Sequence, residues 1–190
     1  MRSMHVTTLT HDPLPADRPA RPDLHVVQIA RSGRVSRALR VTTAALVVTG
    51  GYVHFCLYRH GYRTIPKIGV GFGLQVLTSA FVAIALLAGP HRVGRVAHLT
   101  DRLAAALTGV AAAGLAMGTL AAFARTRLPG GLFHFEERGL QPAPQALIAL
   151  VAEIGVLVVA GAWLLAQRAA AREVQTVPTP GGVTRPPITR

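Results

Sequence analysis

The feature that most constrains this chain is a set of four long segments that lack Asp, Glu, Lys and Arg, apart from one glutamate in the last. They cover residues 41–58, 68–90, 103–124 and 145–167. An α-helix rises about 1.5 Å per residue, so about 20 residues cross the hydrocarbon core of a bilayer, which is about 30 Å thick. Soluble core helices keep a polar stripe, which these segments lack. The pattern predicts an all-α fold, a four-helix transmembrane bundle over residues 41–167.

The glutamate in the last segment, Glu153, does not change this prediction. An acidic residue at the centre of a membrane helix costs about 3 kcal/mol, whereas each Leu, Ile or Val contributes about 0.3 to 0.6 kcal/mol. The segment 145–167 contains eleven such residues. Their sum exceeds the cost of the acid, so the segment is expected to insert.

The flanks differ from the spans in composition. Residues 1–23 are rich in proline, and residues 168–190 repeat that pattern, so both are predicted to be disordered cytoplasmic tails. Residues 24–40 alternate apolar residues with arginine, which is typical of an amphipathic helix on the membrane surface. The arginines expected to meet anionic lipid there are Arg31, Arg34, Arg37 and Arg40.

The net charge of +12 is unevenly distributed along the chain. Of the 20 Lys and Arg residues, 14 lie in residues 1–40, the 91–102 loop and residues 168–190, and 6 lie in the two remaining connections. Positive residues favour the cytoplasmic side, so we expect a multi-pass protein of the inner membrane with both termini in the cytoplasm. Because membrane orientation accounts for most of the positive charge, we do not expect the chain to bind nucleic acid. A single cysteine, Cys56, excludes a disulfide framework and cysteine-built metal sites, and no cofactor or metal is expected.

Small residues mark where helices pack in lipid, because hydrophobicity does not drive helices together there. Gly114 and Gly118, continued by Ala111, form such a ridge on the third span. Two uses are open: packing within the bundle, or pairing with a second copy or another membrane protein.

Polar residues within the spans form a second pattern. His54, Gln75, Thr119 and Glu153 come from four different spans and lie at similar depths in the outer half, so they are expected to form one buried polar cluster. An ionisable group inside a membrane indicates a functional site by default. The alternative is a polar clamp that fixes helix register, since such hydrogen bonds contribute about 1 kcal/mol each and still specify pairing.

The two outer connections supply further candidates. Residues 129–145 mix aromatic and charged side chains and are too polar to span. They are either a lid over the polar cluster or a plain amphipathic connector. The candidate residues of the outer loops are Tyr58, Arg59, Tyr62, Arg63, His134 and Glu136. The first loop forms either a tight hairpin touching lipid headgroups or an anion site beside a helix N-terminus.

Two stretches carry a resemblance. Residues 54–58 (HFCLY), 61–69 (GYRTIPKIG) and Phe72, with a later match at 131–147 and Glu153, resemble a group of four-pass membrane proteins from high-GC actinobacteria. About 100 residues are covered. No activity is established for that group, so the resemblance implies a four-helix membrane fold and no substrate.

No nucleophile and base stand at a spacing typical of catalysis, so an enzyme is not expected. The sequence favours a structural or partner-binding membrane component, with the bilayer as its first partner. The alternative is a small proton- or ion-coupled transporter in which Glu153 is the exchanging group.

Overall fold

The computed structural model describes the backbone of residues 24–176 and the side chains of residues 33–172. In chain order its helices are α1 (Leu24–Arg59), the 3₁₀ helix η1 (Tyr62–Thr64), α2 (Ile68–Ala88), α3 (Pro90–Ala97), α4 (Asp101–Thr126) and α5 (Gln145–Thr176). Within the described residues the single β pairing is an isolated bridge between Leu132 and Phe135. The all-α prediction is confirmed. The predicted tail 1–23 lies outside the described residues, as does 177–190.

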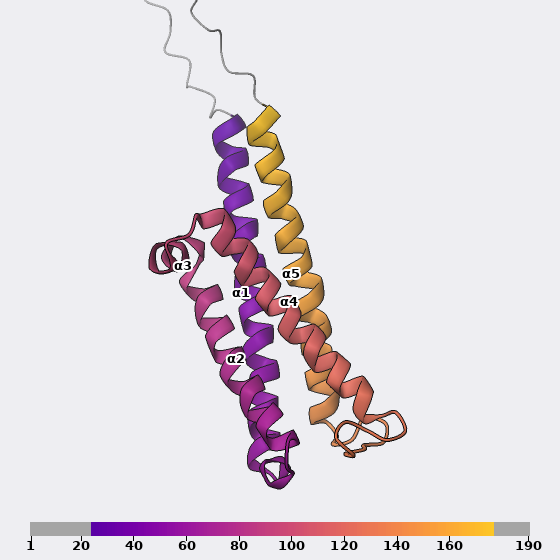
Figure 1. The fold of residues 1–190 in the computed structure, drawn as a ribbon. Coiled ribbons are helices and arrows are strands. Elements are labelled where there is room, and N and C mark those ends of the chain that lie inside the picture. Colours follow the sequence, from indigo (N-terminus) through magenta and orange to yellow (C-terminus); the bar gives the residue numbers. More distant parts are fainter. Residues whose placement is uncertain (1–23, 177–190) are drawn as a thin grey trace, which may run out of the picture.

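Four helices are long and apolar enough to cross a membrane, which agrees with the four segments found in the sequence. The candidate spans are Gly33–Arg59, Ile68–Ala88, Asp101–Thr126 and Gln145–Arg172. The fold is therefore compatible with a multi-pass integral membrane protein. The two long connections, residues 60–67 and 127–144, lie at one end of the bundle, called the loop end below; the other end is the α3 end (Figure 1).

Three boundaries differ from those the sequence predicted. Helix α1 runs through Arg40 without a break, so 24–40 is continuous with the first span and not a separate segment. Helix α5 continues to Thr176, into the predicted tail 168–190. The 91–102 loop contains α3, which the charge pattern did not reveal; Pro90 starts it, and the preceding Gly89, at φ 85°, separates it from α2.

Arg40 joins α1 to the end of α2. Its Nη1 donates to the carbonyl oxygen of Leu86 and, at 3.4 Å, to that of Leu87. A cation at a helix C-terminus meets carbonyls that have no partner within the helix. Arg40 is thus engaged with protein, whereas the side chain of Arg31 lies outside the described residues.

Helix α1 packs along both α2 and α5, and α4 packs along α5 and α3. Helices α2 and α4 meet more sparingly. They lie near each other at the α3 end and diverge toward the loop end (Figure 1). The side chain of Trp163 fills the bundle near the α3 end, where its Nε1 donates to Ser36 Oγ at 3.1 Å.

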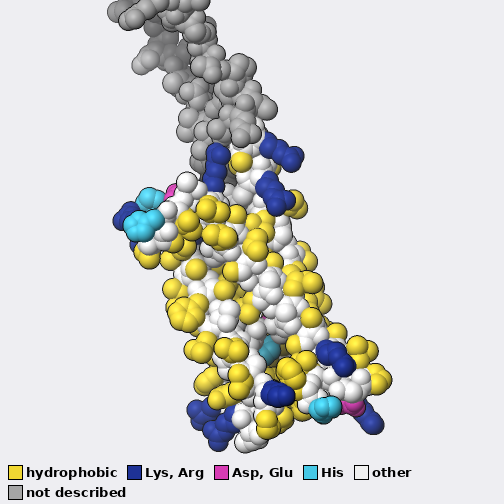
Figure 2. All heavy atoms as spheres, viewed as in Figure 1, with side chains coloured by type: hydrophobic (Ala, Val, Ile, Leu, Met, Phe, Trp, Pro, Cys, Tyr) yellow, Lys and Arg dark blue, Asp and Glu magenta, His cyan; other side chains and the backbone are white. Residues whose placement is uncertain are grey.

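Small residues are buried and large apolar residues face outward. Seven alanines are at most 3% exposed, namely Ala44, Ala104, Ala105, Ala112, Ala116, Ala152 and Ala160. Every span has large apolar side chains, valines among them, that face out. Figure 2 shows this hydrophobic surface over the middle of the bundle, with Lys and Arg toward its two ends. Soluble proteins seldom expose apolar patches of this extent, whereas helices in lipid do.

The ridge of Gly114 and Gly118 does not pack within the described bundle. Both residues are exposed, and a side chain added at either would meet nothing within 4 Å. The first use predicted for this ridge, packing inside the bundle, is therefore wrong, because α4 turns its buried alanines and not these glycines toward α5. Pairing with a second chain stays a prediction.

Candidate functional site

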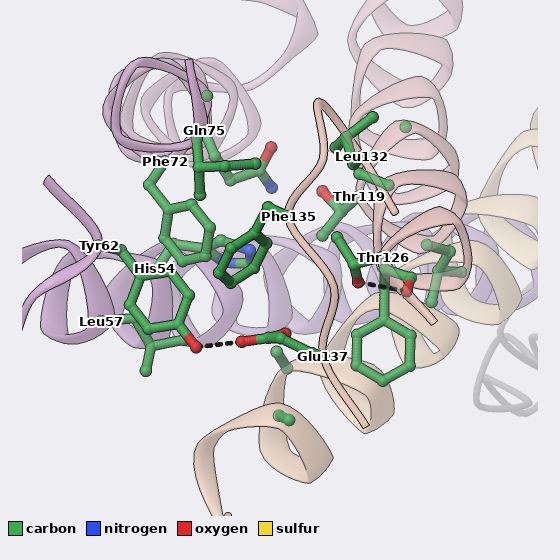
Figure 3. A pocket seen from close by; sticks show the side chains of 18 of the residues that line it. His54, Leu57, Tyr62, Phe72, Gln75, Thr119, Thr126, Leu132, Phe135 and Glu137 are labelled. Carbon is green, nitrogen blue, oxygen red and sulfur yellow. Dashed lines mark hydrogen bonds between the residues drawn. The ribbon is translucent and has the colours of Figure 1, made fainter. Parts of the chain in front are cut away.

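A cavity of about 200 Å³ lies in the loop-end half of the bundle. All four long helices line it, and residues of η1 and of the connection 127–144 close its end. The side chains of His54, Gln75, Thr119 and Phe135 point into this space from four different segments (Figure 3). The structure thus brings the predicted polar cluster, Glu153 included, to one cavity.

Glu153 lies on α5 among alanines that line the same cavity, Ala146 and Ala149. Its side chain is 4% exposed. The carboxyl group sits against the backbone of α1 at Gly50, where an added Cβ would lie 2.9 Å from Oε1. Glycine at this position therefore allows the acid to reach the bundle interior.

Gln75 is the one side chain of the described residues that hydrogen bonds to Glu153. Its Nε2 donates to Oε1 over 3.4 Å, which is longer than the usual range of about 2.7 to 3.2 Å for such bonds. Thr119 does not reach the acid, because its Oγ1 donates to the carbonyl oxygen of Leu115 in its own helix at 3.0 Å. The carboxyl group is thus held loosely.

His54 is oriented by its own helix. Its Nδ1 lies 2.8 Å from the carbonyl oxygen of Gly50. A carbonyl only accepts, so Nδ1 carries a proton, and Nε2 is left as an acceptor when the ring is neutral. The ring packs at a tilt against Phe72, with centroids 5.2 Å apart. His54 makes no hydrogen bond to Glu153, so imidazole and carboxyl present two separate polar groups to the cavity.

The loop end is closed by contacts between the two connections. Tyr62 stacks on Phe72 at 4.8 Å and meets the edge of Phe135 at 5.8 Å. The hydroxyl group of Tyr62 donates to Glu137 Oε1, as Figure 3 shows. Burial, followed by the bond to the Glu137 carboxylate, raises the pKa of Tyr62 above its usual range, so its hydroxyl keeps the donated proton.

Arg127 completes this closure, which we call the latch: Tyr62, Glu137 and Arg127. Its Nη1 lies 3.2 Å from Glu137 Oε2, and both side chains are about 15% exposed. Its Nε and Nη2 donate to the carbonyl oxygens of Gly139 at 2.9 Å and Gln141 at 2.8 Å. Arg127 therefore folds the connection back over the end of α4.

Sequence reasoning did not single out Glu137 or Arg127. It named their neighbours His134 and Glu136, which are exposed and outside the cavity lining. Glu136 instead accepts from the backbone N–H of Gly130 at 2.6 Å. The chain turns between the bridged residues Leu132 and Phe135, where Phe133 and His134 both have positive φ. This turn leaves Leu132, Phe133, Phe135 and Glu137 in the cavity lining and His134 and Glu136 outside it. No pattern of charge or hydropathy fixes the register of that turn.

Of the remaining outer-loop candidates, Tyr62 alone lines the cavity. Tyr58 is half-buried, with its ring near Gly73, and Arg59 and Arg63 are exposed. The backbone of Arg63 packs against Gly69, where a Cβ would approach its carbonyl oxygen to 2.8 Å. The first loop is thus a tight hairpin. Its predicted contact with lipid headgroups and the alternative anion site both stay predictions.

Besides Lys67 and the ion pair of Arg127 and Glu137, the cavity offers the Glu153 carboxyl, the His54 imidazole and the Gln75 amide within a lining that is otherwise mostly apolar and aromatic. Such a set accepts hydrogen bonds and takes up one positive charge. Among residues 33–172, no three His, Cys, Asp or Glu side chains are grouped closely enough to hold a metal ion. Comparison of the chain with protein-family models, curated proteins and solved structures finds no match.

Proposed function

We propose that this protein is a multi-pass membrane protein that binds a small, mostly apolar molecule carrying an amine, with Glu153 as the partner of that amine. The observation that carries the proposal is the buried Glu153 carboxyl group, which has one long hydrogen bond and faces a cavity of about 200 Å³. A polar clamp needs short, saturated bonds between helices. A binding site needs an acceptor that is still available.

The cavity limits the size of the molecule. An apolar cavity of about 150 Å³ in a soluble protein binds benzene, so a space slightly larger fits one aromatic ring with a short polar substituent. Phe72 and Phe135 line the cavity and offer ring contacts. Arg127, Glu137 and Lys67 also line the cavity, and Arg127 and Glu137 form an ion pair with each other. Glu153 makes no ion pair with any described residue, and it favours one cationic partner because an unpaired charge in a low-dielectric site is costly.

The same geometry supports proton coupling. An uncharged amine that takes the proton of the Glu153 carboxyl group gives the same ion pair as an ammonium ion that meets the carboxylate. Neither route leaves a net charge in the bundle. By a third route, an ammonium ion meets the protonated Glu153 carboxyl group, forms the same ion pair and releases one proton to the medium. This route would couple binding to proton exchange, which supports the transporter alternative. The excess of Lys and Arg at the α3 end supports an orientation in the inner membrane with the loop end outside.

Benzylamine binding to the full chain in lipid nanodiscs tests the proposal. We expect Glu153→Gln to weaken benzylamine binding about tenfold or more, which corresponds to about 1.4 kcal/mol, and to leave benzyl alcohol binding nearly unchanged. The matched control is Glu136→Gln, which removes an exposed acid from the same end of the molecule. Equal benzylamine affinity in Glu153→Gln and the control would reject Glu153 as the binding group.

A second candidate, a partner-binding component, is favoured by the open ridge of Ala111, Gly114 and Gly118, all exposed on α4. Small residues let two helices approach closely in lipid. The expected outcome is that Gly114→Leu lowers the yield of cross-linked dimers in native membranes, whereas Gly161→Leu, at another open glycine, leaves it unchanged. A monomer in both cases would remove this candidate.

A further inference from the structure

The cavity has a side that no other part of the described chain covers. Gly71 of α2 and Gly118 of α4 both line it and are both exposed. A side chain added at either position would meet nothing within 4 Å. These helices diverge toward the loop end, and Figure 2 shows the face between them hollowed (Figures 1 and 2). The gap between Gly71 and Gly118 is therefore open from the cavity to the surface of the bundle.

The surface around this gap is apolar. Leu74, one turn from Gly71, is 59% exposed, and Met117, next to Gly118, is 56% exposed. These side chains lie within candidate spans. The gap thus opens on the face that lipid acyl chains would cover, because apolar side chains at this depth are stable against hydrocarbon.

The other route into the cavity, through the loop end, is closed. The latch joins the first connection to the second, and the rings of Tyr62, Phe72 and Phe135 stack beneath it. Entry from water at this end requires these contacts to break. The structure therefore presents a closed aqueous end and an open lateral side.

We propose that the ligand enters sideways from the lipid, through a portal between Gly71 and Gly118. This inference rests on the proposed function and narrows its ligand class to lipid-soluble amines that cross the portal uncharged. On arrival the amine nitrogen takes the proton from the Glu153 carboxyl group: the O–H bond breaks, an N–H bond forms, and an ammonium–carboxylate pair remains. His54 Nε2 and the Gln75 amide oxygen stand in the same cavity as further acceptors.

The portal is tested by the rate at which benzylamine associates with the full chain in lipid nanodiscs. We expect Gly118→Trp and Gly71→Trp to slow association about tenfold or more, since each indole would block the gap. The matched control is Gly114→Trp, one turn away on α4, which is equally open but outside the cavity lining. Its association rate should equal that of the unmodified chain.

A second ligand decides between routes. Benzyltrimethylammonium keeps its charge in lipid, so it should associate about tenfold more slowly than benzylamine or not at all. Equal association rates of benzylamine and benzyltrimethylammonium, or equal benzylamine rates in Gly118→Trp and Gly114→Trp, would overturn the portal while Glu153-dependent binding persists. An absence of saturable, Glu153-dependent binding in the unmodified chain would overturn the proposed function and the portal with it.

Discussion

At Gly50 the lack of a side chain lets the first span touch the carboxyl group of the last. An added methyl group would lie 2.9 Å from Glu153 Oε1, closer than carbon and oxygen tolerate, so the acid or the helix must move. Gly114 also lacks a side chain, but this allows no close contact, because no atom lies within 4 Å of the place that a Cβ would take. Two glycines in different helices thus have opposite roles, and only the atoms around them distinguish the two cases.

This difference predicts opposite effects of one substitution. Gly50→Ala should lower the free energy of unfolding by about 1 to 3 kcal/mol, as overpacking of a filled site does. Gly114→Ala should raise it by about 0.5 to 1 kcal/mol, because alanine favours the helix. Chemical denaturation in mixed micelles measures both. Equal stability of the two variants would show that the Glu153 carboxyl group does not rest on Gly50.

Tyr62 predicts a pH dependence of the latch. Because burial raises its pKa, the folded state keeps the phenol protonated above pH 10, where the phenol of an unfolded chain ionises. The latch therefore contributes its full stability below about pH 10 and loses it as the pH rises further. The difference in unfolding free energy between the unmodified chain and Tyr62→Phe should be constant from about pH 6 to 9 and shrink above about pH 10. A difference that falls between pH 6 and 9 would contradict this assignment.

At the scale of elements, the connection 127–144 is organised by one side chain. Arg127 bonds to Glu137, Gly139 and Gln141, so it ties the second half of the connection to the end of α4. This connection carries Phe135 over the cavity. Arg127 therefore holds Phe135 over the cavity through its contacts with Glu137, Gly139 and Gln141, which lie 10 to 14 residues further along the chain.

The expected outcome for Arg127→Gln is faster hydrogen exchange at the backbone amides of residues 130–141, with exchange in α1 and α5 unchanged. The reason is that several hydrogen bonds are lost together and the Glu137 carboxylate loses its cationic partner, at a cost of about 1 to 3 kcal/mol. Arg125→Gln is the control, since Arg125 makes one long bond, 3.3 Å, to Pro129. Equal protection in both variants would mean that the connection is held by other contacts.

At the scale of the whole molecule, the start of α1 and the end of α5 lie at the same end of the bundle (Figure 1), so both would be on the same side of a membrane. The distribution of Lys and Arg predicts which side that is. In a Cys56→Ser background, His134→Cys at the loop end should react with a membrane-impermeant maleimide added outside cells. Arg92→Cys at the α3 end should react only after permeabilisation. The reverse pattern would invert the proposed orientation and place the cavity in the cytoplasmic leaflet.

The sequence alone determined the helical class, the four spans and the shared depth of His54, Gln75 and Glu153, because hydropathy and helical rise are local properties. It did not determine that α1 runs unbroken through Arg40, or that the ridge of Gly114 and Gly118 faces outward, because helix rotation depends on the neighbours. The tertiary structure alone decided that Glu137 and not Glu136 closes the cavity, and that α2 and α4 part at Gly71 and Gly118. Turn register and helix crossing arise from contacts between residues far apart in the chain, which no local pattern encodes.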